Sequence, residues 1–125
     1  MDIYVFDAGG EFLCPRAPGF WKNHPEQWPV DTLVIGVVSY DFYELMALLD
    51  YGGPDVSTRL ARQLVAAKLN LNAGTDPVIL PVVDEADAFL EVYPPDSDPM
   101  KIDKAVANDL KNQLEQYNDG SCEGE

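Results

Sequence analysis

The sequence predicts a mainly α fold, an irregular four-helix single domain with an N-terminal β-hairpin or extended segment and a Trp/Pro-rich loop. Apolar residues recur at spacings of three and four in four segments, and Gly, Pro or Asn-Gly groups separate these segments. The 125 residues are close to the commonest domain size. We therefore expect one domain over residues 1–125. No apolar run approaches the ~20 residues of a membrane span, so membrane insertion is not expected.

The N-terminal third is predicted to be non-helical. Residues 3–6 and 11–14 are β-prone and flank a Gly-containing stretch, which indicates a hairpin or extended segment over residues 1–13. Residues 19–29 contain both tryptophans and the single histidine, and Pro25 and Pro29 prevent one continuous helix. We interpret this stretch as a rigid loop clamped onto the core. Residues 33–38 are apolar and β-branched, and are expected to be extended and buried.

The first two predicted helices have clear boundaries. Asp41 and Glu44 form a capping-box pattern, and an apolar stripe follows until residues 52–54 end the helix. The second helix is expected to begin near Asp55 or Ser57 and to end at residues 72–74. Its apolar positions cover most of the circumference, which predicts a central helix. The stripe of the first helix is Leu45, Leu48 and Leu49, and the second carries Leu60, Ala61, Leu64, Val65, Ala67, Lys68, Leu69 and Leu71.

The third and fourth helices start near prolines. Asp76-Pro77 and Pro81 are rival starts for the third helix, which residues 94–95 should stop. For the fourth helix, Asp98 is the expected cap and Pro99 the first-turn residue, with residues 118–120 as its end. The expected inward residues are Val82, Val83, Ala86, Phe89 and Leu90 in the third helix, and Ile102, Val106, Leu110, Leu114 and Tyr117 in the fourth.

The charge balance limits the possible partners. With 22 acids and 8 bases the net charge is −14, so the chain repels phosphate backbones and nucleic acid is not expected as a ligand. The charge attracts cations or basic proteins, or serves solubility alone. Residues 84–103 are strongly acidic. Asp96-Ser97-Asp98 begins like a calcium loop but lacks the glycine turn and the terminal glutamate, so we expect a solvated acidic face and no metal.

The tryptophan stretch contains the candidate binding residues. Trp21 and Trp28 are predicted to be core or lid residues, and the alternative is an aromatic platform for a sugar or a peptide, with Asn23 and His24 at its rim. Lys22 is expected in an ion pair, or else at a ligand. His24 is interpreted as a hydrogen-bonded structural residue rather than a general base or metal ligand.

Patterns typical of catalysis are lacking in the sequence. None of the serines stands in a Gly-x-Ser-x-Gly turn, no phosphate-cradling glycine loop is present, and nothing singles out a carboxylate pair for glycoside hydrolysis. We therefore predict a protein that is not an enzyme and that uses no cofactor.

The chain resembles a family of exported and surface proteins of bacteria. The mark of that family is a Gly-Tyr-Trp-Lys-Asn-His-Pro motif followed by Trp-Pro, which stands here at residues 19–25 and 28–29 with Phe20 in place of the tyrosine. Further similarity covers residues 40–41, 64–70, 86–88 and 117–120 before Cys122. The resemblance implies an exported domain, often attached to other surface modules, with no attributed activity.

Three functional hypotheses follow. The first is a non-catalytic extracellular or cell-surface module with a structural, adhesive or assembly role, acting on a protein partner or by self-assembly. The second is an acidic inhibitor or decoy that occupies a basic site on a nucleic-acid-binding protein. The third is a small sugar-binding or hydrolase domain that uses the tryptophan stretch. The first residues show no signal peptide, so an exported form is expected to be either a mature domain or a chain to which Met1 has been added.

The two cysteines, Cys14 and Cys122, fit one disulfide in number and placement, which would close the helical body over residues 14–122. We predict that they are bonded in the folded protein. The bridge would stabilise the fold by up to about 4–5 kcal/mol through the entropy of the unfolded chain. Intact-mass spectrometry without reductant tests this, and two free thiols after aerobic folding would refute the bridge and weaken the case for an oxidising compartment.

Overall fold

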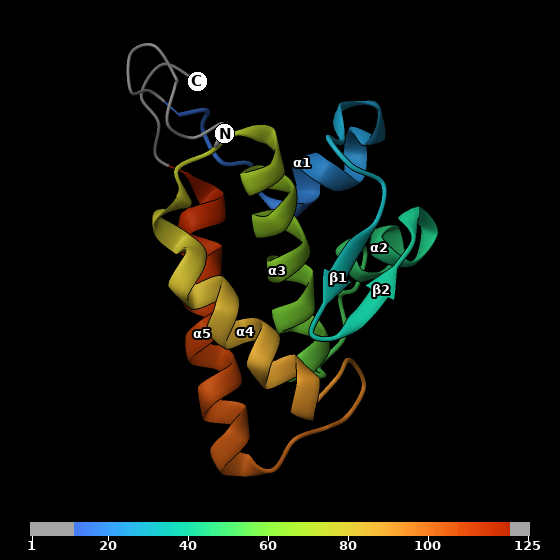
Figure 1. The fold of residues 1–125 in the computed structure, drawn as a ribbon. Coiled ribbons are helices and arrows are strands. Elements are labelled where there is room, and N and C mark those ends of the chain that lie inside the picture. Colours follow the sequence, from blue (N-terminus) through green and yellow to red (C-terminus); the bar gives the residue numbers. More distant parts are fainter. Residues whose placement is uncertain (1–11, 121–125) are drawn as a thin grey trace.

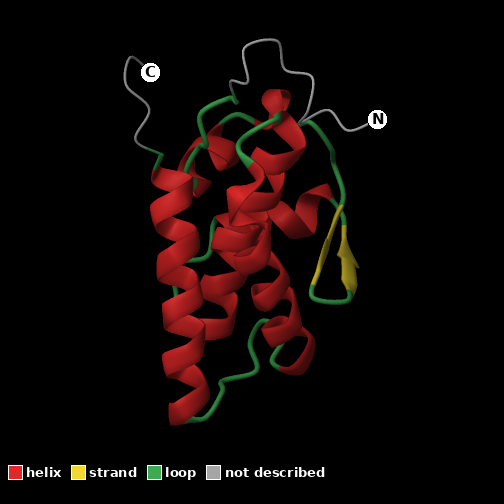
Figure 2. Ribbon diagram, turned by 60° about the vertical axis from the view of Figure 1, so that its left-hand side comes forward, coloured by secondary structure: helices red, strands yellow, loops and turns green. Residues whose placement is uncertain are grey.

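The computed structural model describes residues 12–120 and confirms a mainly helical fold (Figure 1). The described helices are α1 (Pro18–Asn23), α2 (Phe42–Leu49), α3 (Val56–Ala73), α4 (Leu80–Val92) and α5 (Lys101–Asp119). The 3-10 turn η1 (Pro25–Gln27) follows α1, and η2 (Pro77–Ile79) precedes α4. The strands β1 (Leu33–Ile35) and β2 (Val38–Tyr40) pair antiparallel. The hairpin stands to one side of the helices (Figure 2).

Helix α3 lies at the centre of the domain, as predicted. It contacts α1, α2, α4, α5 and β1, and α5 runs beside it in the same direction (Figure 1). The Asp55 side chain caps its first turn, and Gly74 ends it with a φ of 111°, a left-handed conformation that favours glycine. Its fully buried apolar residues are Leu60, Ala61, Leu64, Val65, Ala66, Ala67 and Leu69.

The capping box of α2 is confirmed. The Glu44 amide donates to Asp41 Oδ1 at 2.9 Å, and the Asp41 amide donates to Glu44 Oε1 at 2.8 Å. The predicted stripe of Leu45, Leu48 and Leu49 is buried. The helix ends at Leu49, about one turn before residues 52–54, where the sequence analysis placed its end.

Both rival starts of the third predicted helix are used, because a 3-10 turn precedes the α-helix. Asp76 caps η2, where its Oδ1 accepts from the Val78 amide at 3.0 Å, and Pro81 then lies in the first turn of α4. The predicted inward face is confirmed. Val83, Ala86 and Leu90 are buried, and Val82 and Phe89 pack against the core while half-buried.

Two expectations for the segment before α2 are correct only in part, since Trp21 packs on the core and residues 33–35 form a strand as expected. The tryptophan stretch contains a short helix, α1, because Pro18 is preorganised for a first turn and Pro25 ends the helix. The predicted extended run over residues 33–38 folds back as a hairpin at Gly36, whose φ of 68° suits a tight turn. Leu33 and Ile35 are buried, but the valines of the run are exposed.

The predicted start of the last helix is wrong. Helix α5 begins at Lys101 with Met100 at the N-cap. The Asp98 amide instead donates to Asp55 Oδ1 at 3.1 Å, and the Asp96 amide donates to Asp55 Oδ2 at 2.9 Å. Burial raises the pKa of Asp55, but hydrogen bonds from Thr58 and from these two amides outweigh it and lower the pKa overall. The Asp55 carboxylate therefore holds the α4–α5 connection.

The apolar face of α5 is rotated from the predicted one. Ile102 is 77% exposed and Val106 48% exposed, whereas the buried residues are Ala107, Leu110, Leu114 and Asn118. A polar residue, Asn118, thus occupies a core position that an apolar pattern does not find. The predicted Tyr117 is half-buried and packs against the core.

The described N-terminal residues are extended. The Leu13 amide donates to the Gly74 carbonyl at 3.1 Å, and Leu13 forms a parallel bridge with Thr75. The rest of the hairpin predicted over residues 1–13 lies outside the described residues, as does Cys122. Among residues 12–120, no helix has both the length and the apolar character needed to cross a bilayer.

The burial of Leu64 allows a test of the central position of α3. Leu64 is fully buried, so Leu64→Ala should lower the free energy of unfolding by about 2–5 kcal/mol through lost burial and the cavity left behind. Val78→Ala, at a site that is 70% exposed, should change it by less than about 0.5 kcal/mol. Denaturant melts measure both. An equal small effect would show that α3 is peripheral.

Candidate functional site

The tryptophan motif packs onto α3 through α1 and η1. Trp21 is 3% exposed and lies edge-on to Phe20, with ring centroids 5.2 Å apart. Trp28 follows η1 and is half-buried, and its Nε1 donates to the Trp21 carbonyl at 2.8 Å. This carbonyl also accepts from the His24 amide at the end of α1. The indole of Trp28 therefore holds the backbone of Trp21.

The Trp21 indole is held by Asn70, a fully buried amide in the middle of α3. Asn70 Oδ1 accepts from Trp21 Nε1 at 3.1 Å and from the Arg16 amide at 2.8 Å. Asn70 Nδ2 donates to the Arg16 carbonyl at 2.9 Å and to Asn118 Oδ1 at 2.9 Å. All four hydrogen-bonding positions of this side chain are thus occupied.

The network continues to α5. Asn118, also fully buried, donates through Nδ2 to the Gln63 carbonyl at 3.0 Å and to Gln63 Oε1 at 2.9 Å. Among the described residues, no buried side-chain nitrogen or oxygen lacks a partner. The network links the segment at Arg16, α1, α3 and α5. The sequence analysis did not predict this network. The available signal was Asn70, a polar residue that stands between Leu69 and Leu71 in a helix that is apolar on most sides.

The other motif residues lie at the surface. Lys22 forms the expected ion pair, with its Nζ 2.6 Å from Asp50 Oδ1, and this hydrogen bond lowers the pKa of Asp50. His24 Nδ1 is 3.1 Å from Glu26 Oε2, and its ring stacks on Phe20 with centroids 4.5 Å apart. The Glu26 backbone amide, and next the hydrogen bond to His24, lower the pKa of Glu26. Asn23 is exposed.

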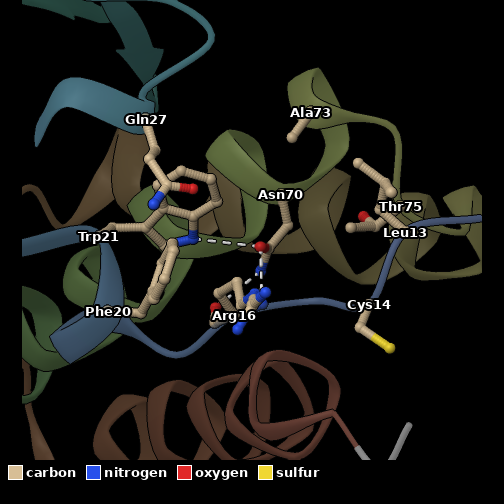
Figure 3. A pocket seen from close by; sticks show the side chains of 9 residues that line it. All are labelled: Leu13, Cys14, Arg16, Phe20, Trp21, Gln27, Asn70, Ala73 and Thr75. Atoms are coloured by element: carbon tan, nitrogen blue, oxygen red, sulfur yellow. Dashed lines mark hydrogen bonds between the residues drawn. The ribbon is translucent and has the colours of Figure 1, made fainter. Parts of the chain in front are cut away.

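A pocket of about 230 Å³ opens beside the buried indole (Figure 3). The Arg16 guanidinium lies 4.6 Å from the centroid of the Phe20 ring, a cation–π contact on one wall. The pocket is lined by Leu13, Cys14, Arg16, Phe20, Trp21, Gln27, Asn70, Ala73 and Thr75. Because the Asn70 amide is fully engaged within the protein, it offers no further hydrogen bond to a ligand in the pocket. The chemistry that the pocket supports is the binding of a small, partly apolar group.

The predicted site residues are thus only partly assembled. The structure brings Trp21 and Cys14 to one pocket, and Trp28 is bonded to the Trp21 backbone. Asn23 is exposed, and His24 is half-buried against Phe20. No group of three His, Cys, Asp or Glu side chains suited to a metal occurs within residues 12–120. Comparison of the chain with protein-family models, curated proteins and solved structures finds no match. The family resemblance of the motif stays a prediction.

Trp21→Ala tests the structural role of the motif. Loss of this buried indole should cost about 3–5 kcal/mol of unfolding free energy, since it removes both apolar packing and the donor to Asn70. His24→Ala, at the C-terminal end of α1, is the matched control. It should lower the free energy of unfolding by less than about 1 kcal/mol, because the hydrogen bond from His24 to Glu26 is exposed. Chemical denaturation compares the two. A Trp21→Ala variant that unfolds like the parent would refute the clamp.

Proposed function

We propose that this chain is a non-catalytic module of an extracellular or cell-surface protein, with a structural, adhesive or assembly role. The observation that supports this proposal is that the tryptophan motif makes its contacts within the protein itself. Trp21 is buried and bonded to Asn70, and Lys22 is paired with Asp50. A sugar platform needs an exposed ring face, so the burial of Trp21 favours a clamp over a sugar-binding or hydrolase site.

The hairpin is the surface best suited to assembly. Val34, Val37 and Val38 are 51%, 63% and 49% exposed. The outer edge of β2 has no partner strand in the described part of the chain, because the sheet contains β1 and β2 alone. Unpaired backbone groups beside exposed valines are a template for another strand.

The hairpin is held rigidly, which suits it for docking. The Gly36 amide donates to Asp87 Oδ1 at 2.8 Å, and Lys68 Nζ lies 2.7 Å from Asp87 Oδ2. Lys68 also donates to the Val34 carbonyl at 2.6 Å, which covers the inner edge of β1. A Cβ at Gly36 would lie 3.1 Å from the Leu90 backbone carbon, so the turn sits closely on α4. Because the hairpin is already ordered, association at this surface should cost little conformational entropy.

The occupant that we assign to this edge is a second copy of the chain. Two β2 strands related by a twofold axis would pair antiparallel and extend each hairpin into a four-stranded sheet. Each copy has a net charge of −14, which opposes this contact. Salt screens such repulsion over about 8–10 Å. Self-association driven by the valines should therefore strengthen as salt is raised.

The acidic inhibitor is the second candidate, supported by a different observation. Asp84, Glu85 and Glu91 are exposed on α4 and, within the described residues, make no ion pair. A carboxylate face of this kind attracts a basic protein surface. Because that attraction is screened, its binding should weaken as salt is raised, the opposite of the trend expected for assembly through the hairpin.

Sedimentation velocity over a range of protein and salt concentrations tests the assembly role. We expect a dimer whose fraction rises with salt, and Val38→Lys should abolish it because a lysine on an edge strand opposes pairing. Val78→Lys is the control, since it adds the same charge at an exposed valine on η2. A monomer under all conditions would refute the self-assembly, and salt-weakened binding to a basic protein would then favour the inhibitor.

A further inference from the structure

A second groove, between α3 and α5, differs from the rest of the surface in its charge. It has a volume of about 270 Å³ and is lined by Tyr51, Gly52, Arg59, Arg62, Gln63, Lys111 and Glu115. Three of the chain's eight basic residues meet there with one carboxylate, in a protein that has 22 acids. The groove is therefore locally cationic although the protein is strongly anionic.

The two arginines of the groove form no ion pair in the described part of the chain, although the hydrogen bond from Lys22, and after it the charge of Arg62, lowers the pKa of Asp50. Arg59 and Arg62 are three residues apart on α3 and so project from one side of the helix, where like charges repel. Neither makes an ion pair within residues 12–120, in spite of the excess of acids. Arg62 Nε donates to the Leu49 carbonyl at 2.9 Å, which orients the guanidinium and leaves its Nη groups for a ligand.

The other lining groups add donors. Tyr51 Oη accepts from the Asp55 amide at 2.9 Å, so its own proton is directed elsewhere. Gln63 uses Oε1 to accept from Asn118, and its Nε2 remains a donor. Lys111 Nζ lies 3.3 Å from Glu115 Oε1, the one carboxylate of the groove. Two guanidinium groups, an ammonium, a hydroxyl and an amide thus line the groove together with one carboxylate, that of Glu115. Outside this lining, Asp50 is paired with Lys22 and also interacts electrostatically with Arg62.

We propose that this groove binds a phosphate group, either free phosphate or a phosphate monoester. A phosphate dianion offers three terminal oxygens that accept from guanidinium forks, and so it uses more of these donors than one carboxylate does. The volume leaves room for a small organic part beside the phosphate. A nucleic-acid backbone does not fit this assignment, because the −14 charge repels an extended polyanion at long range. The groove and the hairpin are separate surfaces. Failure of the phosphate proposal therefore leaves the assembly proposal intact, and the reverse also holds.

Amide and arginine side-chain NMR titration with inorganic phosphate tests the site on the intact chain. We expect saturable shifts centred on Gly52, Arg59 and Arg62. Arg59→Gln should weaken binding about tenfold by removing one charged fork. Lys101→Gln removes an exposed cation at the start of α5 and should leave the affinity unchanged. Phosphoserine serves as the monoester probe, and tighter binding of it than of inorganic phosphate identifies an ester as the ligand class.

Glu115→Gln tests for a gain of binding. It removes the carboxylate that competes for Lys111, so phosphate should bind several-fold tighter. A variant with a damaged fold would lose affinity, so tighter binding cannot be explained by misfolding. Shifts that do not saturate, an equal loss in the Lys101→Gln variant, or unchanged affinity in both Arg59→Gln and Glu115→Gln would overturn the site.

Discussion

The amide of Asn70 is the interaction on which the arrangement of this domain depends. A buried polar side chain costs stability unless its hydrogen bonds are made, and Asn70 makes all of them to groups on three other segments. Both the amide and the carbonyl of Arg16 bind to it, so it substitutes for a partner strand at that point. Since these bonds require one relative position of α1, α3 and α5, the network selects a unique packing where apolar contacts alone tolerate several.

The structural role of the tryptophan motif depends on that network. Trp21 supplies apolar area to the core and one directed hydrogen bond, and the Trp28 indole donates to the Trp21 carbonyl. The pocket beside Phe20 and Arg16 is a consequence of this arrangement, because the indole and Asn70 form its inner wall. A motif with the residue types of a binding site thus serves mainly to close the domain.

Charge is distributed unevenly over the fold. Where cations are paired, they hold elements together: Lys68 and Asp87 are 16% and 25% exposed and fasten the hairpin to α3 and α4, and Lys22 and Asp50 join α1 to the end of α2. The more buried of these pairs contributes most to position, since solvent screens the other. Within the described residues the arginines of α3 form no ion pair, which sets the α3–α5 groove apart from the acidic faces.

The sequence by itself determined the elements whose signals are local. The capping box at Asp41, the left-handed end of α3 at Gly74 and the central position of α3 depend on short-range hydrogen bonds and on apolar periodicity. Features with partners distant in the chain were decided only by the tertiary structure. Asp98 looks like a helix cap, but its φ of 50° is left-handed and not the extended conformation of a cap, and its amide donates to Asp55, which is 43 residues away. The core role of Asn70 and Asn118, 48 residues apart, likewise follows from which helix faces meet, and local propensity carries no information about that.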